Sequence, residues 1–275
     1  MSYPDIRSAL RQGTELLGAA GAQVPRLTAE VLLGHALRRE RAYLFAHPER
    51  GLSQLEWIHY GRYLHQRIQG MPTQYITQVQ EFYGRTFRVT PDVLIPRPET
   101  EHLVEAAIPL CSGHVVEAGC GSGAIAITLA LEAGAVVTST DISYPALQVA
   151  RQNADSLGAS VNFIACDLLS ALADNSARLV VSNPPYIRTG ALLAREVRDW
   201  EPAAALFAGE DGLAVYRGLI PEASRVLQPG GFLALELGFD SLPGVIELLR
   251  AGFLEPRIIP DLAGIPRVLV CGKAG

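Results

Sequence analysis

Residues Val115-Val-Glu-Ala-Gly-Cys-Gly-Ser-Gly123 join two β-branched residues to a turn with three glycines, and the apolar stretch Ala124–Leu131 follows at once. This order is typical of a buried strand that turns sharply into a helix. Glycines in such a turn permit positive φ angles and let a ligand approach the backbone closely. The spacing is G-x-G-x-G rather than the G-x-G-x-x-G of dinucleotide-binding proteins, so the turn predicts a nucleotide-type site without naming its ligand.

Strand and helix continue to alternate toward the end of the chain. Strands are predicted at residues 136–140, 161–165, 178–182, 231–237, 256–259 and 267–271, with helices at 145–157 and 242–249. This alternation predicts an α/β fold, a doubly wound Rossmann-like sheet with helices on both faces. Ligands of such sheets bind beyond the carboxyl ends of the strands, so the residues that follow each strand are the candidates for a site.

The first part of the chain has a different pattern. Residues 1–72 place apolar side chains at helical spacing; Thr28 is predicted to cap a second helix, and Ser53-Gln-Leu-Glu56 matches a capping box that opens a third. Two strands, Gln74–Val79 and Arg85–Val89, predict a hairpin. We therefore expect a small N-terminal helical domain over 1–72, a β-hairpin linker over 73–97 and the sheet domain over 98–275.

Two acidic residues end predicted strands. Asp141 lies about twenty residues after the glycine turn, where a carboxylate can accept hydrogen bonds from both ribose hydroxyls; the alternative is a cap for the next helix. Asp167 ends the following strand, where it can receive an exocyclic adenine amine. Ile142 and Leu168 can pack on the two faces of the ring, and for them plain core packing is the alternative.

Asn183-Pro-Pro-Tyr186 follows the predicted strand 178–182 and is the most specific motif in the chain. The Asn183 side chain offers both a carbonyl acceptor and an amide donor, while Pro184 and Pro185 fix the directions of the backbone carbonyls. A planar NH2 group could donate one hydrogen to Asn183 and the other to the Pro184 carbonyl, beside the aromatic wall of Tyr186. The alternative is a simple proline turn after a strand.

A nitrogen held in this way is suited to accept a methyl group. An amide nitrogen is a weak nucleophile because its lone pair is delocalised, and two fixed acceptors on its hydrogens raise its electron density. A sulfonium methyl is already activated, so alignment is the main requirement and can supply roughly 7–11 kcal/mol of the barrier. Glu117 is placed to bind the amino-acid tail of an adenosyl sulfonium donor or to favour its positive sulfur. No His or Cys is placed for covalent catalysis.

Composition excludes several other classes. The net charge of −5 argues against a large nucleic-acid face, although residues 1–70 hold 9 Arg against 6 Asp and Glu, a balance of +3. The four cysteines are widely spaced with no C-x-x-C pair, so neither a metal site nor a disulfide framework is expected. Neither a run of eighteen apolar residues nor a secretory signal is found, so we expect a cytoplasmic protein without membrane association.

With these motifs in place, the chain resembles the protein-glutamine N5-methyltransferases that modify peptide chain release factors. The resemblance covers nearly the whole chain and rests on Leu94-Ile-Pro-Arg-Pro-Glu-Thr-Glu101, Asn183-Pro-Pro-Tyr186, Glu201-Pro-Ala-Ala-Ala-Leu-Phe-Ala-Gly-Glu-Asp-Gly-Leu213 with Tyr216-Arg217, and Asp261-Leu-Ala-Gly-Ile-Pro-Arg-Val268. It implies S-adenosyl-L-methionine as donor, with S-adenosyl-L-homocysteine as product. It also implies that the acceptor is the glutamine of the Gly-Gly-Gln motif in bacterial class 1 release factors, which the N-terminal domain would hold. No direct nucleic-acid partner is implied.

The resemblance also implies which residues form the site. Asn183, Pro184, Pro185 and Tyr186 would hold the glutamine, with Arg97 lining the site, and Asn183, Pro184 and Tyr186 would be the catalytic set. The cofactor would contact Phe82, Glu117, Gly119, Cys120, Gly121, Ser122, Gly123, Asp141, Ile142, Asp167, Leu168 and Asn183. The chain departs from the family at Glu117, where Asp is common, at Ala208-Gly209, a frequent glycine pair, and at Leu168, a position often aromatic.

Other functions share part of this pattern. A glutamine methyltransferase for a ribosomal protein has the same chemistry, but residues 94–101 and the N-terminal domain favour release factors. A DNA adenine N6-methyltransferase also uses Asn-Pro-Pro-Tyr, but it needs a basic groove for base flipping. A nicotinamide dehydrogenase could use the glycine turn and would leave Asn183–Tyr186 unexplained. A non-catalytic module would bind the cofactor without transferring its methyl group.

Overall fold

The computed structural model describes residues 3–250 and 252–274, which fall into two compact units. One unit comprises residues 3–78 together with Ala194–Trp200. The other comprises Val79–Leu193 and the described residues from Glu201 onward. The chain therefore leaves the second unit after Leu193, contributes one short segment to the first, and returns at Glu201.

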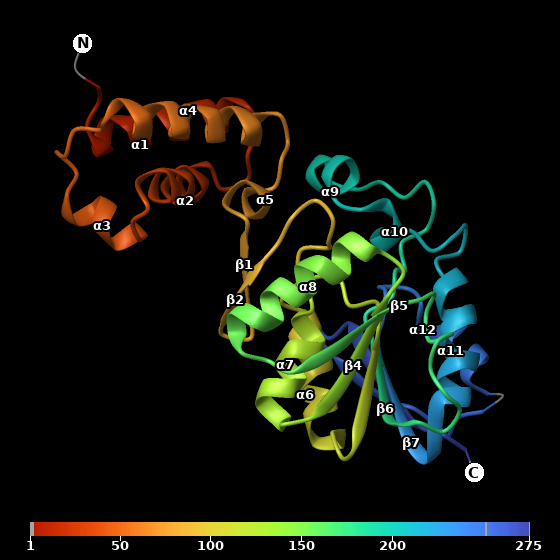
Figure 1. Cartoon of the computed structure of the whole chain (residues 1–275). Helices are drawn as coiled ribbons and strands as arrows, with labels where there is room; N and C mark the ends of the chain where they lie inside the picture. Colours follow the sequence, from red (N-terminus) through yellow and green to blue (C-terminus); the bar gives the residue numbers. More distant parts are fainter. Residues whose placement is uncertain (1–2, 251, 275) are drawn as a thin grey trace. The chain divides into compact units, whose positions relative to one another are not determined.

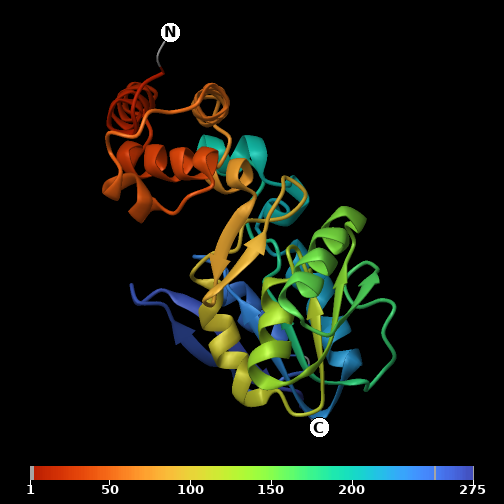
Figure 2. The ribbon, with the colours of Figure 1, turned by 60° about the vertical axis from the view of Figure 1, so that its left-hand side comes forward.

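The first unit is helical. Its elements are α1 (Ile6–Ala19), α2 (Pro25–Leu37), α3 (Arg41–Ala46), α4 (Gln54–Ile68), α5 (Thr73–Thr77) and α9 (Arg195–Trp200). Leu10, Leu33 and Tyr60 lie in the hydrophobic core that α1, α2 and α4 share, and Figure 2 views α1 and α4 nearly along their axes with α2 running across them. α1 and α4 each bury one apolar face, whereas α2 is buried over most of its surface, which accounts for the helical periodicity of the sequence in α1 and α4.

The helix starts follow from local capping. Ser53 accepts the backbone N–H of Glu56, and Glu56 accepts the backbone N–H of Ser53, so the predicted capping box is confirmed. The predicted cap at Thr28 is wrong, because α2 begins three residues earlier, at Pro25. Proline is favoured at the first helical position, where the missing N–H costs nothing, and Thr28 is buried within the helix.

The second unit opens with a hairpin of β1 (Val79–Phe82) and β2 (Arg85–Arg88). Tyr83 and Gly84, with φ of +50° and +70°, form the two-residue turn that matches the twist of paired strands. The predicted strand Gln74–Val79 is wrong: Thr73–Thr77 form α5, which follows Pro72 and ends at Gln78 in the left-handed region.

A seven-stranded sheet forms the centre of this unit. Its strands are β3 (His114–Ala118), β4 (Val136–Asp141), β5 (Val161–Ala165), β6 (Ala177–Ser182), β7 (Leu227–Glu236), β8 (Arg257–Pro260) and β9 (Pro266–Gly272). They lie in the order β5-β4-β3-β6-β7-β9-β8. The first five are parallel, and β9 runs antiparallel to both of its neighbours. Figure 1 labels β4, β5, β6 and β7 of this sheet. The predicted doubly wound α/β sheet is thus confirmed, with a mixed edge.

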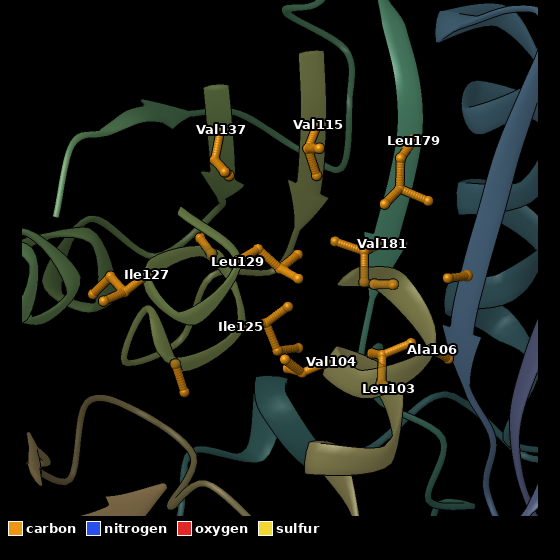
Figure 3. Packing of buried hydrophobic residues seen from close by; sticks show 14 of the residues in the cluster. Leu103, Val104, Ala106, Val115, Ile125, Ile127, Leu129, Val137, Leu179 and Val181 are labelled. Carbon is orange, nitrogen blue, oxygen red and sulfur yellow. The ribbon is translucent and has the colours of Figure 1, made fainter. Parts of the chain in front are cut away.

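Helices cover both faces of the sheet. They are α6 (Thr100–Ala107), the 3-10 turn η1 (Ile108–Leu110), α7 (Ala124–Ala133) and α8 (Tyr144–Leu157), then α11 (Ala214–Val226) and α12 (Leu242–Leu249). The short helix α10 (Ala203–Leu206) lies at the cavity beyond the strand ends instead. Successive strand residues point to opposite faces, so Val115 packs with α6 and α7 while Val116 packs with α11 and α12. Figure 3 shows the first of these clusters, where Val115 and Val181 lie near Leu129.

The order of the chain reverses between β3 and β6, which are hydrogen-bonded neighbours. The Ser182 hydroxyl at the end of β6 donates to the Ala118 carbonyl at the end of β3, at 2.7 Å. The glycine turn 119–123 and residues 183–186 therefore emerge side by side. A reversal point of this kind leaves a crevice beyond the carboxyl ends of the strands, where ligands of such sheets bind.

Candidate active site

A cavity of about 280 Å³ lies at the carboxyl ends of the parallel strands. The predicted site residues that line it are Arg97, Glu117, Gly119, Cys120, Gly121, Ser122, Asp141, Ile142, Asp167, Leu168, Asn183 and Pro185. Apart from Arg97, these residues lie at or just after the carboxyl ends of β3, β4, β5 and β6, so segments that are far apart in the sequence meet here. The cavity is thus bounded by the motifs that the sequence placed at strand ends.

The glycine turn leaves open space beside its backbone. Gly119 and Gly121 have φ of +81° and +50°, and a Cβ at either position would meet no atom within 4 Å. The N–H groups of Gly119 and Cys120 donate to the Thr140 carbonyl at 2.8 and 2.9 Å, which holds the turn against β4. A rigid turn without side chains at these points lets a ligand lie directly against the main chain.

Asp141 supports the turn and keeps acceptor capacity for a ligand. Its Oδ2 accepts the Gly121 N–H at 3.0 Å and its Oδ1 accepts the Ser143 N–H at 2.8 Å. The cap of α8 is Ser143, whose hydroxyl accepts the Ala146 N–H, so Asp141 is not the helix cap that was its alternative role. Each carboxylate oxygen has a further lone pair, which suits it to the two hydroxyls of a ribose.

The residues expected around an adenine ring are exposed to the cavity. The Ile142 side chain is 70% exposed although it is a large aliphatic group, so core packing does not explain it. Leu168 is half-buried, adopts a φ of +45°, and contacts α11 near Gly218. Asp167 is exposed beside it. An exposed aliphatic side chain in a cavity is suited to cover the face of a flat apolar ring.

Glu117 is a buried acid at the floor of the cavity. It is 1% exposed and accepts a hydrogen bond from the Ser139 hydroxyl. Burial raises the pKa of its carboxyl to about 8, against the opposing effect of that hydrogen bond. The carboxyl is therefore largely protonated at neutral pH and would ionise more readily when a positively charged ligand group lies beside it.

The Asn183 amide is anchored at one end. Its Nδ2 donates to the Thr100 hydroxyl at 3.1 Å. Thr100 is buried at the first position of α6, so this partner is fixed by the packing of the helix on the sheet. An amide held through its NH2 keeps its carbonyl oxygen for an incoming donor, which is the orientation that recognition of a second amide requires.

Pro184 and Tyr186 do not line the cavity, unlike Asn183 and Pro185. Pro184 is buried. The ring of Tyr186 packs against Gly238 so closely that a Cβ there would lie 2.9 Å from it, and its hydroxyl donates to Glu236 Oε1 at 3.4 Å. Burial raises the pKa of the Tyr186 phenol, so the group stays neutral. The ring is thus rigidly held next to Asn183 in the chain.

Arg97 reaches the cavity as half of an ion pair with Glu201. The Glu201 side chain is 2% exposed, and its other oxygen accepts the Ile95 N–H at 3.3 Å. This carboxylate therefore ties the segment 94–101 to the start of the segment 201–213. Both segments belong to the motifs on which the family resemblance rests, although the sequence did not show that they meet.

The expectation that Phe82 lines the site needs correction. Its side chain is 1% exposed and packs edge to face against Phe87, with ring centroids 6.0 Å apart, within the hydrophobic cluster between the sheet and its helices. Because strand residues alternate between two faces, the last residue of β1 is directed into the core. Gly123 is likewise a packing residue, since a Cβ there would lie 2.8 Å from Ile127 Cδ1.

Sequence reasoning did not single out Thr100, Glu201 or Glu236. Thr100 and Glu201 lie inside motifs that were quoted as wholes, and only their contacts distinguish them from their neighbours. Glu236 did carry a signal, because it is the one charged residue in the apolar run Phe232–Leu237. A carboxyl at a buried strand position is uncommon unless it is paired.

Across residues 3–250 and 252–274, no group of three or more His, Cys, Asp or Glu side chains is arranged to hold a metal ion. Over the same residues, every helix is too short or too polar to cross a membrane.

Comparison with known proteins agrees with this geometry. The model of the PrmC N-terminal domain matches residues 8–77, and that of the methyltransferase small domain matches residues 98–198. The release factor glutamine methyltransferase of Koribacter versatilis is 44% identical over 98% of each chain, and that of Moorella thermoacetica is 43% identical over 95% of this chain and 96% of its own. Among solved structures, a T. thermophilus 16S rRNA N2 G1207 methyltransferase in complex with AdoMet and guanosine is 21% identical, with a TM-score of 0.54 over 71% of this chain and 50% of its own. That likeness shows a shared methyltransferase fold.

Proposed function

Because the chain belongs to the release factor glutamine methyltransferase family, we propose that it transfers a methyl group from S-adenosyl-L-methionine to the side-chain amide nitrogen of a release-factor glutamine. The observation that carries the proposal is the anchored amide of Asn183, whose NH2 donates to Thr100 beside a cavity that can hold the donor. The acceptor is the glutamine of the Gly-Gly-Gln motif in bacterial class 1 release factors, modified at N5.

The cavity has the features that the methyl donor requires. The open space beside Gly119 and Gly121 would be filled by any side chain there, and Asp141 keeps lone pairs for the ribose. Ile142 would cover the adenine, and Glu117 would face the amino-acid tail and the sulfur. When bound, S-adenosyl-L-methionine supplies an activated methyl group on a positively charged sulfur.

The residues of the chain then act on the glutamine. The Asn183 carbonyl oxygen accepts one hydrogen of the substrate NH2, and the Pro184 carbonyl accepts the other. Both contacts raise the electron density of the nitrogen and aim its lone pair at the methyl carbon. The new N–C bond forms as the C–S bond breaks, and the nitrogen releases one of its original hydrogens as a proton. The proton can leave to solvent, so a strong general base is not required.

The domain roles follow from the same proposal. We assign residues 1–72 to binding of the release factor, 73–97 to a hairpin linker and 98–275 to catalysis. The matches of an N-terminal domain model to residues 8–77 and of a methyltransferase model to residues 98–198 support this division. Because release factors act at the ribosome, we place the enzyme in the cytoplasm.

The decisive experiment locates the transferred methyl group. The protein is incubated with methyl-labelled donor and a purified class 1 release factor, and the product is digested and sequenced by mass spectrometry. We expect one methyl group on the glutamine of the Gly-Gly-Gln motif, and none on a release factor that carries alanine at that position. No label on the release factor, with label on a ribosomal protein or on DNA adenine in parallel incubations, would contradict the proposal.

A further inference from the structure

Glu236 is a carboxylic acid held inside the sheet. It is the last residue of β7, it is 1% exposed, and its neighbours along the strand, Leu235 and Leu237, are fully buried. Its Oε2 makes no well-formed hydrogen bond among the described residues. Burial of a carboxyl in apolar surroundings is unfavourable unless the group has partners, so its presence here calls for a function.

The partners of Glu236 lead directly to the Asn-Pro-Pro-Tyr motif. The Tyr186 hydroxyl donates to Oε1 at 3.4 Å. The Thr100 side chain interacts with the same carboxyl and lowers its pKa. The Thr100 hydroxyl in turn accepts the Asn183 NH2 at 3.1 Å. Glu236 therefore meets one end of the motif directly and the other end through a single hydroxyl group.

The direction of these hydrogen bonds decides how Asn183 is turned. A threonine hydroxyl has one hydrogen, and it can either donate or accept toward Asn183. When a carboxylate takes that hydrogen, the hydroxyl can only accept, so the NH2 end of Asn183 must face it. Without the carboxylate, the hydroxyl could donate to the Asn183 carbonyl oxygen, and the amide could turn over.

We propose that Glu236 is a positioning residue of the amide clamp: by accepting the hydroxyl hydrogens of Thr100 and Tyr186 it directs the carbonyl oxygen of Asn183 toward the substrate. A turned-over Asn183 would present its NH2 to the substrate NH2, where two donors meet and no hydrogen bond forms. The inference rests on the proposed function, because it assigns Glu236 to the same transfer step. Glu236 lies behind the motif and does not line the cavity, so it touches neither donor nor acceptor.

The ionisation of Glu236 gives the proposal a second consequence. Burial raises the pKa of its carboxyl to about 7, against the hydrogen bond from Thr100 and the charge of Arg267. Below that pH the protonated carboxyl can donate, which removes the constraint on Thr100, and above it the carboxylate only accepts. Of the other groups around it, Glu99 raises its pKa, and Tyr186 and Tyr216 stay neutral because burial raises theirs. Turnover should therefore rise with pH through about 7.

The test uses near-isosteric variants. Glu236→Gln keeps the shape of the side chain but adds a donor, and Thr100→Val removes the hydroxyl that links Glu236 to Asn183. Each variant should lower kcat for release-factor methylation by about 10- to 100-fold while KM for the release factor and Kd for the donor stay within about twofold. The reduction of kcat in the double variant should be much smaller than the product of the two single reductions, because both substitutions break the same link from Glu236 through Thr100 to Asn183. The rise of kcat near pH 7 should be absent in Glu236→Gln.

The matched control is Glu132→Gln, which removes one negative charge from an exposed position on α7 that pairs with Arg85. It should leave kcat unchanged. Glu117 also titrates, but it is present in both proteins. The difference between the pH profiles of kcat for the wild type and for Glu236→Gln therefore gives the contribution of Glu236 alone. The proposal would be overturned if Glu236→Gln had the kcat of the wild type. It would also be overturned if the reduction of kcat in the double variant equalled the product of the two single reductions.

A measurement on the protein without substrate separates this inference from the proposed function. The side-chain NH2 of Asn183 is assigned in ¹⁵N-labelled protein by comparison with Asn183→Ala, and its hydrogen exchange is followed by NMR. The exchange should become about tenfold faster in both Glu236→Gln and Thr100→Val. If the wild-type protein methylates no release factor but the exchange rates rise in the variants, only the proposed function fails. If the exchange rate of the Asn183 NH2 is unchanged in a folded Glu236→Gln protein, the role of Glu236 is refuted.

Discussion

Replacement of Glu117 by glutamine should make the donor-free protein more stable and its donor binding weaker. The pKa of the buried Glu117 carboxyl is raised from 4.5 to about 8, with burial as the main cause. In the unfolded chain the group ionises near pH 4.5. Between these two values the folded protein holds a proton that the unfolded chain releases, so stability falls as the pH rises from about 4.5 toward 8.

The size of this loss of stability follows from the difference between the pKa of Glu117 in the unfolded chain and in the folded protein. Each pH unit over which the folded group stays protonated costs about 1.4 kcal/mol of unfolding free energy, so the loss at pH 7 is on the order of 3 kcal/mol. Glutamine cannot ionise, and its carbonyl can still accept from the Ser139 hydroxyl. The free energy of unfolding of the variant should therefore equal that of the wild type below pH 4.5 and exceed it by a few kcal/mol at pH 7. The affinity of the variant for the donor should fall about 10- to 100-fold, because it has no negative charge near the sulfonium and the amino group.

Urea unfolding followed by far-UV circular dichroism at several pH values from 4.5 to 8 measures this difference. Both tryptophans, Trp57 and Trp200, belong to the helical unit, so circular dichroism reports on the sheet better than tryptophan fluorescence does. Glu132→Gln, an exposed charge change, should show no such gain. A Glu117→Gln protein that is less stable than wild type at pH 7, or whose stability changes with pH as steeply as that of the wild type, would refute this reasoning.

Three other substitutions probe the site. Asn183→Ala should lower kcat by about 10²- to 10³-fold with donor Kd nearly unchanged, because it removes an acceptor that acts on the reacting nitrogen; an equal loss of donor affinity in calorimetry would contradict this. Asp141→Ala should raise donor Kd by about 10- to 100-fold, since it removes the ribose acceptor and the support of the glycine turn; unchanged calorimetric affinity would rule out the ribose contact. Glu201→Gln should cost about 1–3 kcal/mol in urea unfolding, because it weakens the contacts to Arg97 and Ile95; full stability would show that this pair does not join the two segments.

Local physical chemistry made much of the fold predictable. The strand 161–165 and the helix 242–249 were predicted with the bounds that the structure has, because Val161, Phe163 and Ile164 favour a strand and the helix has a clear amphipathic pattern. The capping box at Ser53 needs only two residues, three positions apart, and was also predictable. The short helix α5 was missed because Tyr75, Ile76 and Thr77 favour strands intrinsically, while tertiary packing buries them in a single helical turn.

Phe82 illustrates the limit for a site residue. The family resemblance placed it near the cofactor, but the direction of a strand side chain depends on where the strand begins and how it pairs. The hairpin pairs Phe82 with Arg85 across a two-residue turn, and this register directs the ring into the core beside Phe87. A register of one residue more or less would have turned it outward.

By itself, the sequence determined the order of the elements and the residues that stand at the strand ends, since both depend on neighbours within a few positions. It thereby placed Gly119, Asp141 and Asn183 beyond three strands of one sheet. Only the tertiary structure decided that Thr100 meets Asn183, that Glu201 meets Arg97 and that Glu236 lies behind Tyr186. These pairs are separated by 50 to 104 residues, and their contacts arise because segments far apart in the chain meet around the carboxyl end of the sheet rather than from any pattern in the local chain.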